Sequence, residues 1–291
     1  MPELKKLVAE ELGEPVDPRV ADLAQAIADR HGRAARAILF YGSCLRQRQL
    51  EGLMLDFYLI VSDYRAAYAK RWLALANRLI PPNVFYIEKD GLAAKYAVLS
   101  EADFARECGP EARSTSVVAR FAQPARLVWS SGKAAAAMAI GSVSRCAPTL
   151  LGWTLPMLPK GTPVLDLWKH AFSLTFAAEL RAERSDRSAA IVEADEERYQ
   201  TFGDAALAGL AIGNRRQRAR WWKRMRGKGK LLSVLRLAKA SATFAGGADY
   251  IAWKINRHAG TKIALKPWQR RWPLLAGLTL LPRLLKSGAV R

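Results

Sequence analysis

Short apolar runs alternate with amphipathic segments over residues 1–131. Apolar side chains recur at helical spacing from Pro18 to His31 and Gly32 is a stop signal, so a helix is expected there. A second helix is expected from Tyr64 to Leu79, before Pro81-Pro82. Strands are expected over Ala37–Tyr41, Leu53–Val61, Asn83–Glu88, Ala94–Leu99 and Ala125–Trp129, the third and fourth joined through Lys89-Asp90-Gly91.

Helical periods replace these strand signals from Lys133 onward. They are clearest over Val164–Glu183, Ile191–Thr201 and Ala205–Ile212. The sequence therefore predicts an α/β (α+β) fold in three parts. These are an α/β domain over residues 1–131, a mostly helical domain over 132–213 and a C-terminal segment over 214–291.

Charge is distributed very unevenly along the chain. The 46 Lys and Arg outnumber the 26 Asp and Glu, for a formal net charge of +20. Residues 1–213 carry a net charge of only +1, whereas residues 214–291 hold 20 cations and one acid, Asp249. This asymmetry indicates a near-neutral body that carries a surface for a polyanion, either nucleic acid or anionic lipid.

The composition of the basic segment favours a membrane surface over nucleic acid. Trp221, Trp222 and Met225 lie among the cations of Arg215–Lys230, and leucines, Trp253, Trp268, Trp272 and the apolar run Pro273–Leu285 follow. Indole and leucine side chains among cations suit the interface of an anionic bilayer. RNA binding by stacking and a merely solvated basic face are the alternatives.

Export, spanning and metal-cluster signals are missing from the sequence. The first residues have no apolar signal core, and each strongly apolar stretch is shorter than the ~18 residues of a spanning helix. The three Cys and three His show no zinc or disulfide spacing. The expectation is a protein that is not secreted, has no transmembrane helix and lies peripherally on the cytoplasmic side of a membrane.

One candidate site combines a glycine turn with an acidic strand. Gly42-Ser43 follows the first predicted strand and Asp56 opens the second, an arrangement typical of the nucleotidyltransferase superfamily. Gly42 would let the backbone approach a triphosphate, the Ser43 hydroxyl would bond phosphate oxygens and Asp56 would hold Mg²⁺. An ordinary turn and a loop-bonding Asp are the alternative for this pattern alone.

A longer ordered set of motifs gives the pattern more weight. It comprises Tyr41-Gly42-Ser43, Met54–Phe57 running to Val61 and Asp63, Val84–Tyr86, Lys95–Ser100, Ala119–Phe121 with Gln123-Pro124, and Ala178–Arg181. Over about residues 37–260 this set resembles the mitochondrial-type CDP-diacylglycerol synthases, the translocator assembly and maintenance family, which has bacterial relatives. The resemblance implies a nucleotidyltransferase domain, a winged-helix-like domain and a C-terminal segment that meets the membrane.

The resemblance also implies a reaction and a set of site residues. The reaction is the Mg²⁺-dependent transfer of CMP from CTP to phosphatidic acid, giving CDP-diacylglycerol and pyrophosphate. The implied catalytic residues are Asp56, Lys95 and Arg120; Tyr41, Gly42, Ser43, Lys95 and Arg181 would bind the nucleotide, and Asp56 would hold the metal. Glu88, two residues after Tyr86 on another predicted strand, is the candidate for a second metal carboxylate on strand parity rather than on the resemblance. A solvated Glu88, a solvated Lys95, a surface ion pair for Arg120 and a helix-face pair for Arg181 are the alternatives.

Two positions depart from the family pattern. The family usually has Gly-Ser-Gly where this chain has Gly42-Ser43-Cys44, so Cys44 replaces the second glycine. Tyr58 stands where the wider superfamily has its second acid on the strand. Two other functions stay open, the first because of the basic segment and the second because of Tyr58. One is nucleotide transfer to RNA or protein, and the other is a non-catalytic membrane or RNA adaptor on the same scaffold.

Overall fold

The computed structural model describes residues 2–47, 50, 52–179, 187–211 and 213–243. The first half contains α1 (Pro2–Gly13), α2 (Pro18–His31), β1 (Ala35–Tyr41), α3 (Ser43–Gln47), β2 (Met54–Val61), α4 (Tyr64–Ala67), α5 (Arg71–Leu79), β3 (Asn83–Lys89), β4 (Leu92–Ser100), α6 (Glu101–Glu107), α7 (Ser116–Phe121) and β5 (Ala125–Ser130). The second half contains α8 (Lys133–Val143), α9 (Cys146–Thr154), α10 (Val164–Ala177), α11 (Arg187–Glu193), α12 (Glu196–Leu207) and α13 (Arg215–Thr243).

The five strands form one mixed sheet, in the order β3-β4-β2-β1-β5. β2 and β4 are parallel, and the other neighbours are antiparallel. All five predicted strands are present, including the β3–β4 hairpin. The prediction of a mixed α and β fold is confirmed.

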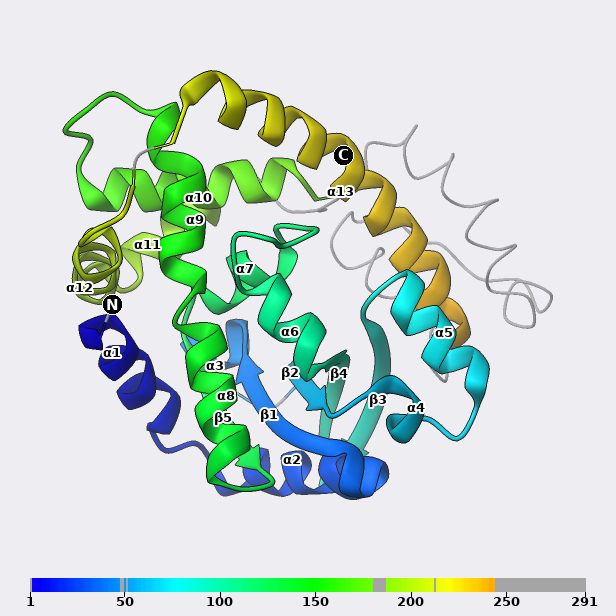
Figure 1. Cartoon of the computed structure of the whole chain (residues 1–291). Coiled ribbons are helices and arrows are strands. Elements are labelled where there is room, and N and C mark those ends of the chain that lie inside the picture. Colours follow the sequence, from blue (N-terminus) through cyan, green and yellow to red (C-terminus); the bar gives the residue numbers. More distant parts are fainter. Residues whose placement is uncertain (1, 48–49, 51, 180–186, 212, 244–291) are drawn as a thin grey trace.

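Both faces of the sheet are buried because the strands are almost continuously apolar and successive side chains point to opposite faces. One face, with Phe40 and Phe57, packs against α2, α4 and α5. The other face, with Leu39 and Tyr58, packs against α1 and α6–α9 and continues into a core around Trp168 (Figure 1). One continuous core therefore contains residues from both sides of the boundary predicted between residues 131 and 132. The division into domains at this boundary stays a prediction.

The single helix predicted from Tyr64 to Leu79 is wrong, because the segment forms two helices, α4 and α5. α4 begins after Asp63, whose carboxylate accepts hydrogen bonds from two amides of its first turn. It ends at Ala67 because Tyr68 adopts an extended backbone and packs 5.9 Å from Phe85, ring centre to ring centre. Burial of one aromatic ring thus outweighs the helical period of the segment, and α5 starts afresh at Arg71.

The helix boundaries predicted after residue 190 are also wrong. The predicted helix Ile191–Thr201 is interrupted after Glu193, because Asp195 caps α12 by accepting a hydrogen bond from the Arg198 amide. α12 then runs through the predicted break before Ala205 and ends at Leu207. α10 begins at Val164 as predicted but ends at Ala177, before the predicted end at Glu183, which lies outside the described residues.

α13 opens the predicted C-terminal segment but belongs to the folded body. The side chains of Trp222 and Met225 are buried, and the Trp222 indole donates a hydrogen bond of 3.0 Å to the Trp153 carbonyl. The interpretation of these two side chains as lipid-facing is therefore wrong. Trp253, Trp268, Trp272 and Pro273–Leu285 lie outside the described residues.

Gly229 allows α13 to approach the body closely. A Cβ atom at Gly229 would lie 2.1 Å from the Ala178 carbonyl oxygen, whereas a Cβ at Gly227 would meet nothing within 4 Å. We expect Gly229→Ala to weaken the packing of α13 by about 1–3 kcal/mol. Gly227→Ala, the matched control, is expected to stabilise the helix by up to about 1 kcal/mol. Thermal unfolding and amide exchange of α13 would check both; equal effects would contradict the close contact.

Among the described residues, one helical stretch has the length and apolar composition to cross a membrane. It is Lys133–Met157, which contains α8 and α9, and 56% of its most apolar window is buried inside the fold. Core helices of this kind meet the same criterion. The expectation of a peripheral protein without a transmembrane helix stays a prediction.

Candidate functional site

The register of three strands brings the predicted site residues together. Tyr41 on β1 pairs with Asp56 on β2, and Asp56 pairs with Lys95 on β4. Directly opposed residues share one face of a sheet, so these three side chains lie side by side. They occupy the same face as Tyr58 but nearer its open end, where Asp56 and Lys95 are only partly buried.

Gly42 packs its backbone directly against Asp56. It follows β1 with a φ of +101°, a conformation that side chains disfavour. A Cβ atom there would lie 3.1 Å from Oδ2 of Asp56. The glycine therefore both makes the turn into α3, which begins at Ser43, and leaves room for the carboxylate.

Asp56 and Lys95 form an ion pair, with 3.0 Å between Oδ1 and Nζ. Their side chains are 20% and 26% exposed, so a ligand can reach both charges. A carboxylate beside an ammonium offers one ligand for a hard cation and one charge for a phosphate oxygen.

Arg120 enters the same face from α7. Its guanidinium carbon lies 5.3 Å from the ring centre of Tyr41 and 5.9 Å from that of Tyr58. Nη1 donates hydrogen bonds to the Ser116 hydroxyl at 3.1 Å and, more weakly, to the Tyr58 hydroxyl at 3.5 Å. The rings and hydroxyls hold a planar cation in a fixed orientation.

The electrostatic surroundings keep Arg120 charged. Burial by itself lowers its pKa, but neighbouring groups outweigh burial and hold the pKa above its ordinary value. These neighbours are the phenols of Tyr41 and Tyr58 and the carboxylates of Glu179 and Asp56. Arg120 therefore lies within electrostatic reach of both Asp56 and Glu179, a residue that follows α10 and that sequence reasoning quoted only as part of a motif.

The two departures from the family pattern have structural explanations. Cys44 lies in helix α3 with a buried side chain, and its Sγ lies 3.5 Å from the Met54 carbonyl. Tyr58 is buried and provides a ring and a hydroxyl to Arg120 in the place of a second strand acid. Position 58 therefore supports a cation in this protein, a role that only the fold reveals.

The other predicted metal ligand, Glu88, lies away from Asp56. Both residues share a face of the sheet, but β4 separates their strands and Glu88 pairs with Ala93, two positions from Lys95. Its Oε2 accepts a hydrogen bond of 2.8 Å from the Tyr86 hydroxyl. No cluster of three or more Asp, Glu, His or Cys suited to a metal occurs among the described residues.

Asp56 fits a metal that is held partly by its substrate. Mg²⁺ commonly takes one or two protein carboxylates and completes its shell with water and substrate phosphates. Asp56 is partly exposed and lies beside a glycine turn, which suits such a shared site. Glu88 as a second ligand stays a prediction, and Arg181 lies outside the described residues.

α13 packs closely against the end of α10. The close approach of Gly229 to the Ala178 carbonyl places the helix beside the residue that precedes Glu179. α13 carries 11 Lys and Arg and no acid within 29 residues. A cationic helix therefore packs beside the chain that leaves α10 and leads to Glu179.

Comparison with known proteins does not identify a family. No protein-family model matches the chain, and no curated protein matches its sequence.

Proposed function

We propose that the protein is a CTP:phosphatidate cytidylyltransferase. The observation that carries the proposal is the convergence of the Gly42 turn, the Asp56–Lys95 pair and Arg120 at one end of one sheet face. A nucleoside triphosphate presents four negative charges and needs this combination of exposed backbone, carboxylate for a metal and fixed cations. The motif order of the resembled family points to CTP and phosphatidic acid as substrates.

The proposed reaction is an in-line displacement at the α-phosphorus of CTP. A phosphate oxygen of phosphatidic acid forms the new P–O bond, and the bond to the β-phosphate oxygen breaks to release pyrophosphate. The nucleophile is already an anion at neutral pH, so no strong general base is required. The task of the protein is to align the two phosphates and to neutralise their charge.

The chain's own residues divide this task. The Gly42 backbone and the Ser43 hydroxyl would hold the triphosphate, and Tyr41 would support the turn. Lys95 would neutralise an oxygen of the reacting phosphate, while Arg120 would hold a phosphate in the bidentate manner of a guanidinium. Asp56 would hold Mg²⁺, which when bound offsets charge on the phosphate oxygens.

We also propose a role for each part of the fold. The sheet with its Gly42 turn would be a nucleotidyltransferase-like domain, and the helices after β5 would correspond to the winged-helix-like domain of the resembled family. The basic residues of α13 and the rest of segment 214–291 would hold the protein on an anionic membrane, where its lipid substrate resides.

Transfer of a nucleotide to RNA or protein is the second candidate. The dense positive charge of α13 favours it, because phosphate backbones bind such surfaces. Incubation with α-labelled CTP and each acceptor separately would distinguish them. Label in the organic phase only with phosphatidic acid supports the cytidylyltransferase. Label on RNA or protein supports the second candidate, and absence of transfer supports the non-catalytic adaptor.

Gly42→Ala provides a test of the turn itself. The methyl group would meet Oδ2 of Asp56 and impose about 1–3 kcal/mol of backbone strain. We expect cytidylyl transfer to fall roughly a hundredfold because the carboxylate is displaced. Gly91→Ala is the matched control, since Gly91 also has positive φ, at +75°, but has open space around it. Equal activity of the two variants would remove Gly42 from the site.

A further inference from the structure

Helix α5 has apolar side chains on both sides: Leu73 and Ala74 face the core together with the polar Asn77, and larger apolar side chains face outward. Asn77 is fully buried, and its Nδ2 donates a hydrogen bond of 2.9 Å to the Val98 carbonyl. Its Oδ1 accepts a hydrogen bond from the Asn83 amide. These bonds fix which face of α5 meets the sheet, because an unpaired buried amide would be costly.

The opposite face of α5 presents a stripe of large apolar side chains. Trp72, Leu75 and Leu79 are 49%, 58% and 68% exposed. Their spacing of three and four residues places them on one side of the helix. Exposed apolar side chains that are contiguous, rather than scattered singly, mark a contact surface.

The stripe lies in a segment with positive charge only. Residues 64–87 contain four cations, Arg65, Lys70, Arg71 and Arg78, and no acid. Helical geometry places Arg71 and Arg78 along one edge of the stripe, and both are exposed. An apolar stripe edged by cations and carrying a Trp has the composition of an interfacial membrane helix.

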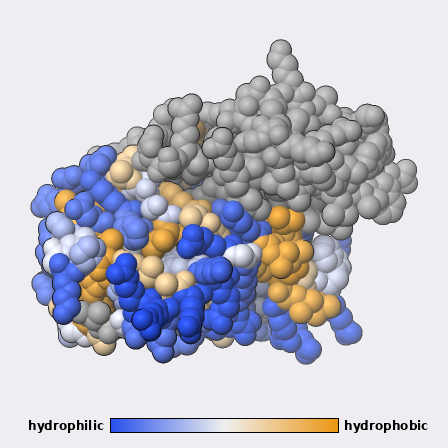
Figure 2. All heavy atoms as spheres, turned by 90° about the horizontal axis from the view of Figure 1, so that it is seen from above, coloured by the Kyte–Doolittle hydropathy of each residue, from blue (hydrophilic) through white to orange (hydrophobic). Residues whose placement is uncertain are grey.

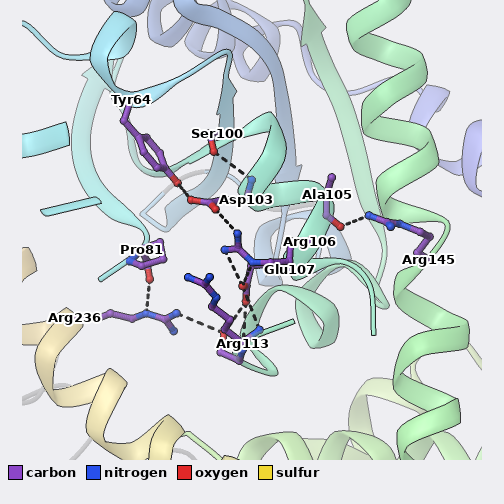
Figure 3. A network of polar contacts seen from close by, with 11 residues as sticks. Tyr64, Pro81, Ser100, Asp103, Ala105, Arg106, Glu107, Arg113, Arg145 and Arg236 are labelled. Carbon is purple, nitrogen blue, oxygen red and sulfur yellow. Dashed lines mark hydrogen bonds and ion pairs between the residues drawn. The ribbon is translucent and has the colours of Figure 1, made fainter. Parts of the chain in front are cut away.

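α13 is fastened to the end of α5. Arg236 donates from Nε to the Pro81 carbonyl at 2.7 Å, and Lys239 donates to the carbonyls of Ile80 and Pro82, the latter at 2.8 Å. Figure 3 shows Arg236 reaching toward Pro81 from α13. The basic helix is thereby held against the chain that leaves α5.

α13 adds a second exposed strip with similar chemistry. Arg224, Lys228, Leu231 and Leu235 are exposed, and their spacing of four, three and four residues places them on one flank. In Figure 2 hydrophobic atoms gather toward the right-hand end of the molecule beside strongly hydrophilic ones. This is the end at which α5 and the last turns of α13 lie in Figure 1.

We infer that the outward face of α5 inserts into the interface of a bilayer with anionic headgroups. Trp72, Leu75 and Leu79 enter the boundary between headgroups and acyl chains, and the flanking arginines pair with lipid phosphates. A second copy of the chain is a poor occupant, since it would oppose like charges. RNA would match the cations but leave the leucines in water.

This contact gives the proposed enzyme a second membrane attachment, within the α/β part of the chain. Its purpose rests on the proposed function, but its test contains neither CTP nor phosphatidic acid. Failure of the membrane contact and failure of the enzymatic proposal are therefore separate results.

The test places an environment-sensitive fluorophore on the full-length protein through Leu75→Cys. The three native cysteines are buried, so the introduced thiol is the accessible one among the described residues. Lys6→Cys on α1 is the matched control, because the Lys6 side chain is 78% exposed and α1 lies on the opposite side of the molecule (Figure 1). Vesicles are phosphatidylcholine alone or phosphatidylcholine with phosphatidylglycerol.

The expected result is a blue shift of the label at position 75, on vesicles with phosphatidylglycerol, and none at position 6. No shift at position 75, or equal shifts at both positions, overturns the inference. A shift that appears without vesicles as protein concentration rises also overturns it, in favour of self-association.

Unlabelled variants provide an independent measurement. Changing Trp72, Leu75 and Leu79 together to Gln is expected to weaken binding to the anionic vesicles roughly tenfold or more. The variant Trp72→Phe with Leu75→Met and Leu79→Met should retain binding, since it keeps the stripe apolar. Equal binding of both triple variants would contradict insertion of α5.

Discussion

The Asp56→Asn variant is expected to lose cytidylyl transfer by roughly a thousandfold or more while remaining folded. An amide is a much poorer ligand for Mg²⁺ than a carboxylate, and it also removes the ionic partner of Lys95, 3.0 Å away. Because this ion pair is partly exposed, its loss is expected to change the free energy of unfolding by at most about 1 kcal/mol. Turnover and thermal unfolding of the same preparation would measure both effects.

Asp63→Asn is the matched control for this variant. Asp63 lies seven residues later in the chain, but its carboxylate caps α4 by accepting hydrogen bonds from the amides of Arg65 and Ala66. Asn is also a good capping residue, so both stability and turnover should stay near their starting values. Near-normal turnover of Asp56→Asn would remove Asp56 from the reacting centre.

Replacement of Arg120 by Gln is expected to lower kcat by roughly a hundredfold to a thousandfold. The change removes a cation that Asp56 and Glu179 stabilise electrostatically, together with the planar group held by Tyr41 and Tyr58. Steady-state kinetics with CTP and phosphatidic acid would measure the loss, and the unfolding temperature would report any structural damage.

Two further variants separate charge from geometry at this position. Arg120→Lys keeps the charge but not the bidentate fork, so it should recover only part of the activity. Arg36→Gln is the control. Arg36 is also a partly buried arginine, in strand β1, and it forms an ion pair of 3.0 Å with Glu101 instead of contacting the candidate site residues. Full activity of Arg120→Gln would show that Arg120 serves packing alone.

The strands could be predicted from sequence because each is a short apolar run bounded by turn residues. Ala35–Tyr41 and Met54–Val61 are buried on both faces, and such runs have few other structural solutions. The ends of the helices were harder to predict from the sequence. The break at Tyr68 depends on a contact with Phe85, which is distant in sequence and so leaves no local signal.

The residues that meet at the candidate site could be named from the sequence, but their arrangement could not. Gly42, Asp56, Lys95 and Arg120 follow from motifs in the sequence. The pairing of Asp56 with Lys95 joins two parallel strands that are separated in the chain by two helices and strand β3. The sequence near either residue does not show such a long-range register. The contact of Tyr58 with Arg120 depends in addition on how α7 packs on the sheet.

Amphipathic patterns do not show which face of a helix is buried. Trp222 suggested a lipid interface, yet it is buried against Trp153 because α13 packs on α9. In α5 the leucines are divided between two faces: Leu73 packs on the core beside the hydrogen-bonded Asn77, whereas Leu75 and Leu79 are exposed. The hydrophobic period gives the spacing of a face and not its direction.

Formation of CDP-diacylglycerol by the purified full-length protein tests the central claim most directly. The protein is incubated with α-labelled CTP, Mg²⁺ and phosphatidic acid in mixed micelles, and label is followed into the organic phase with Asp56→Asn as the control. We predict lipid-soluble label that requires wild-type protein, Mg²⁺ and phosphatidic acid together, with release of one pyrophosphate per label transferred. Label that stays in the aqueous phase, under conditions where a known synthase is active, would contradict the account.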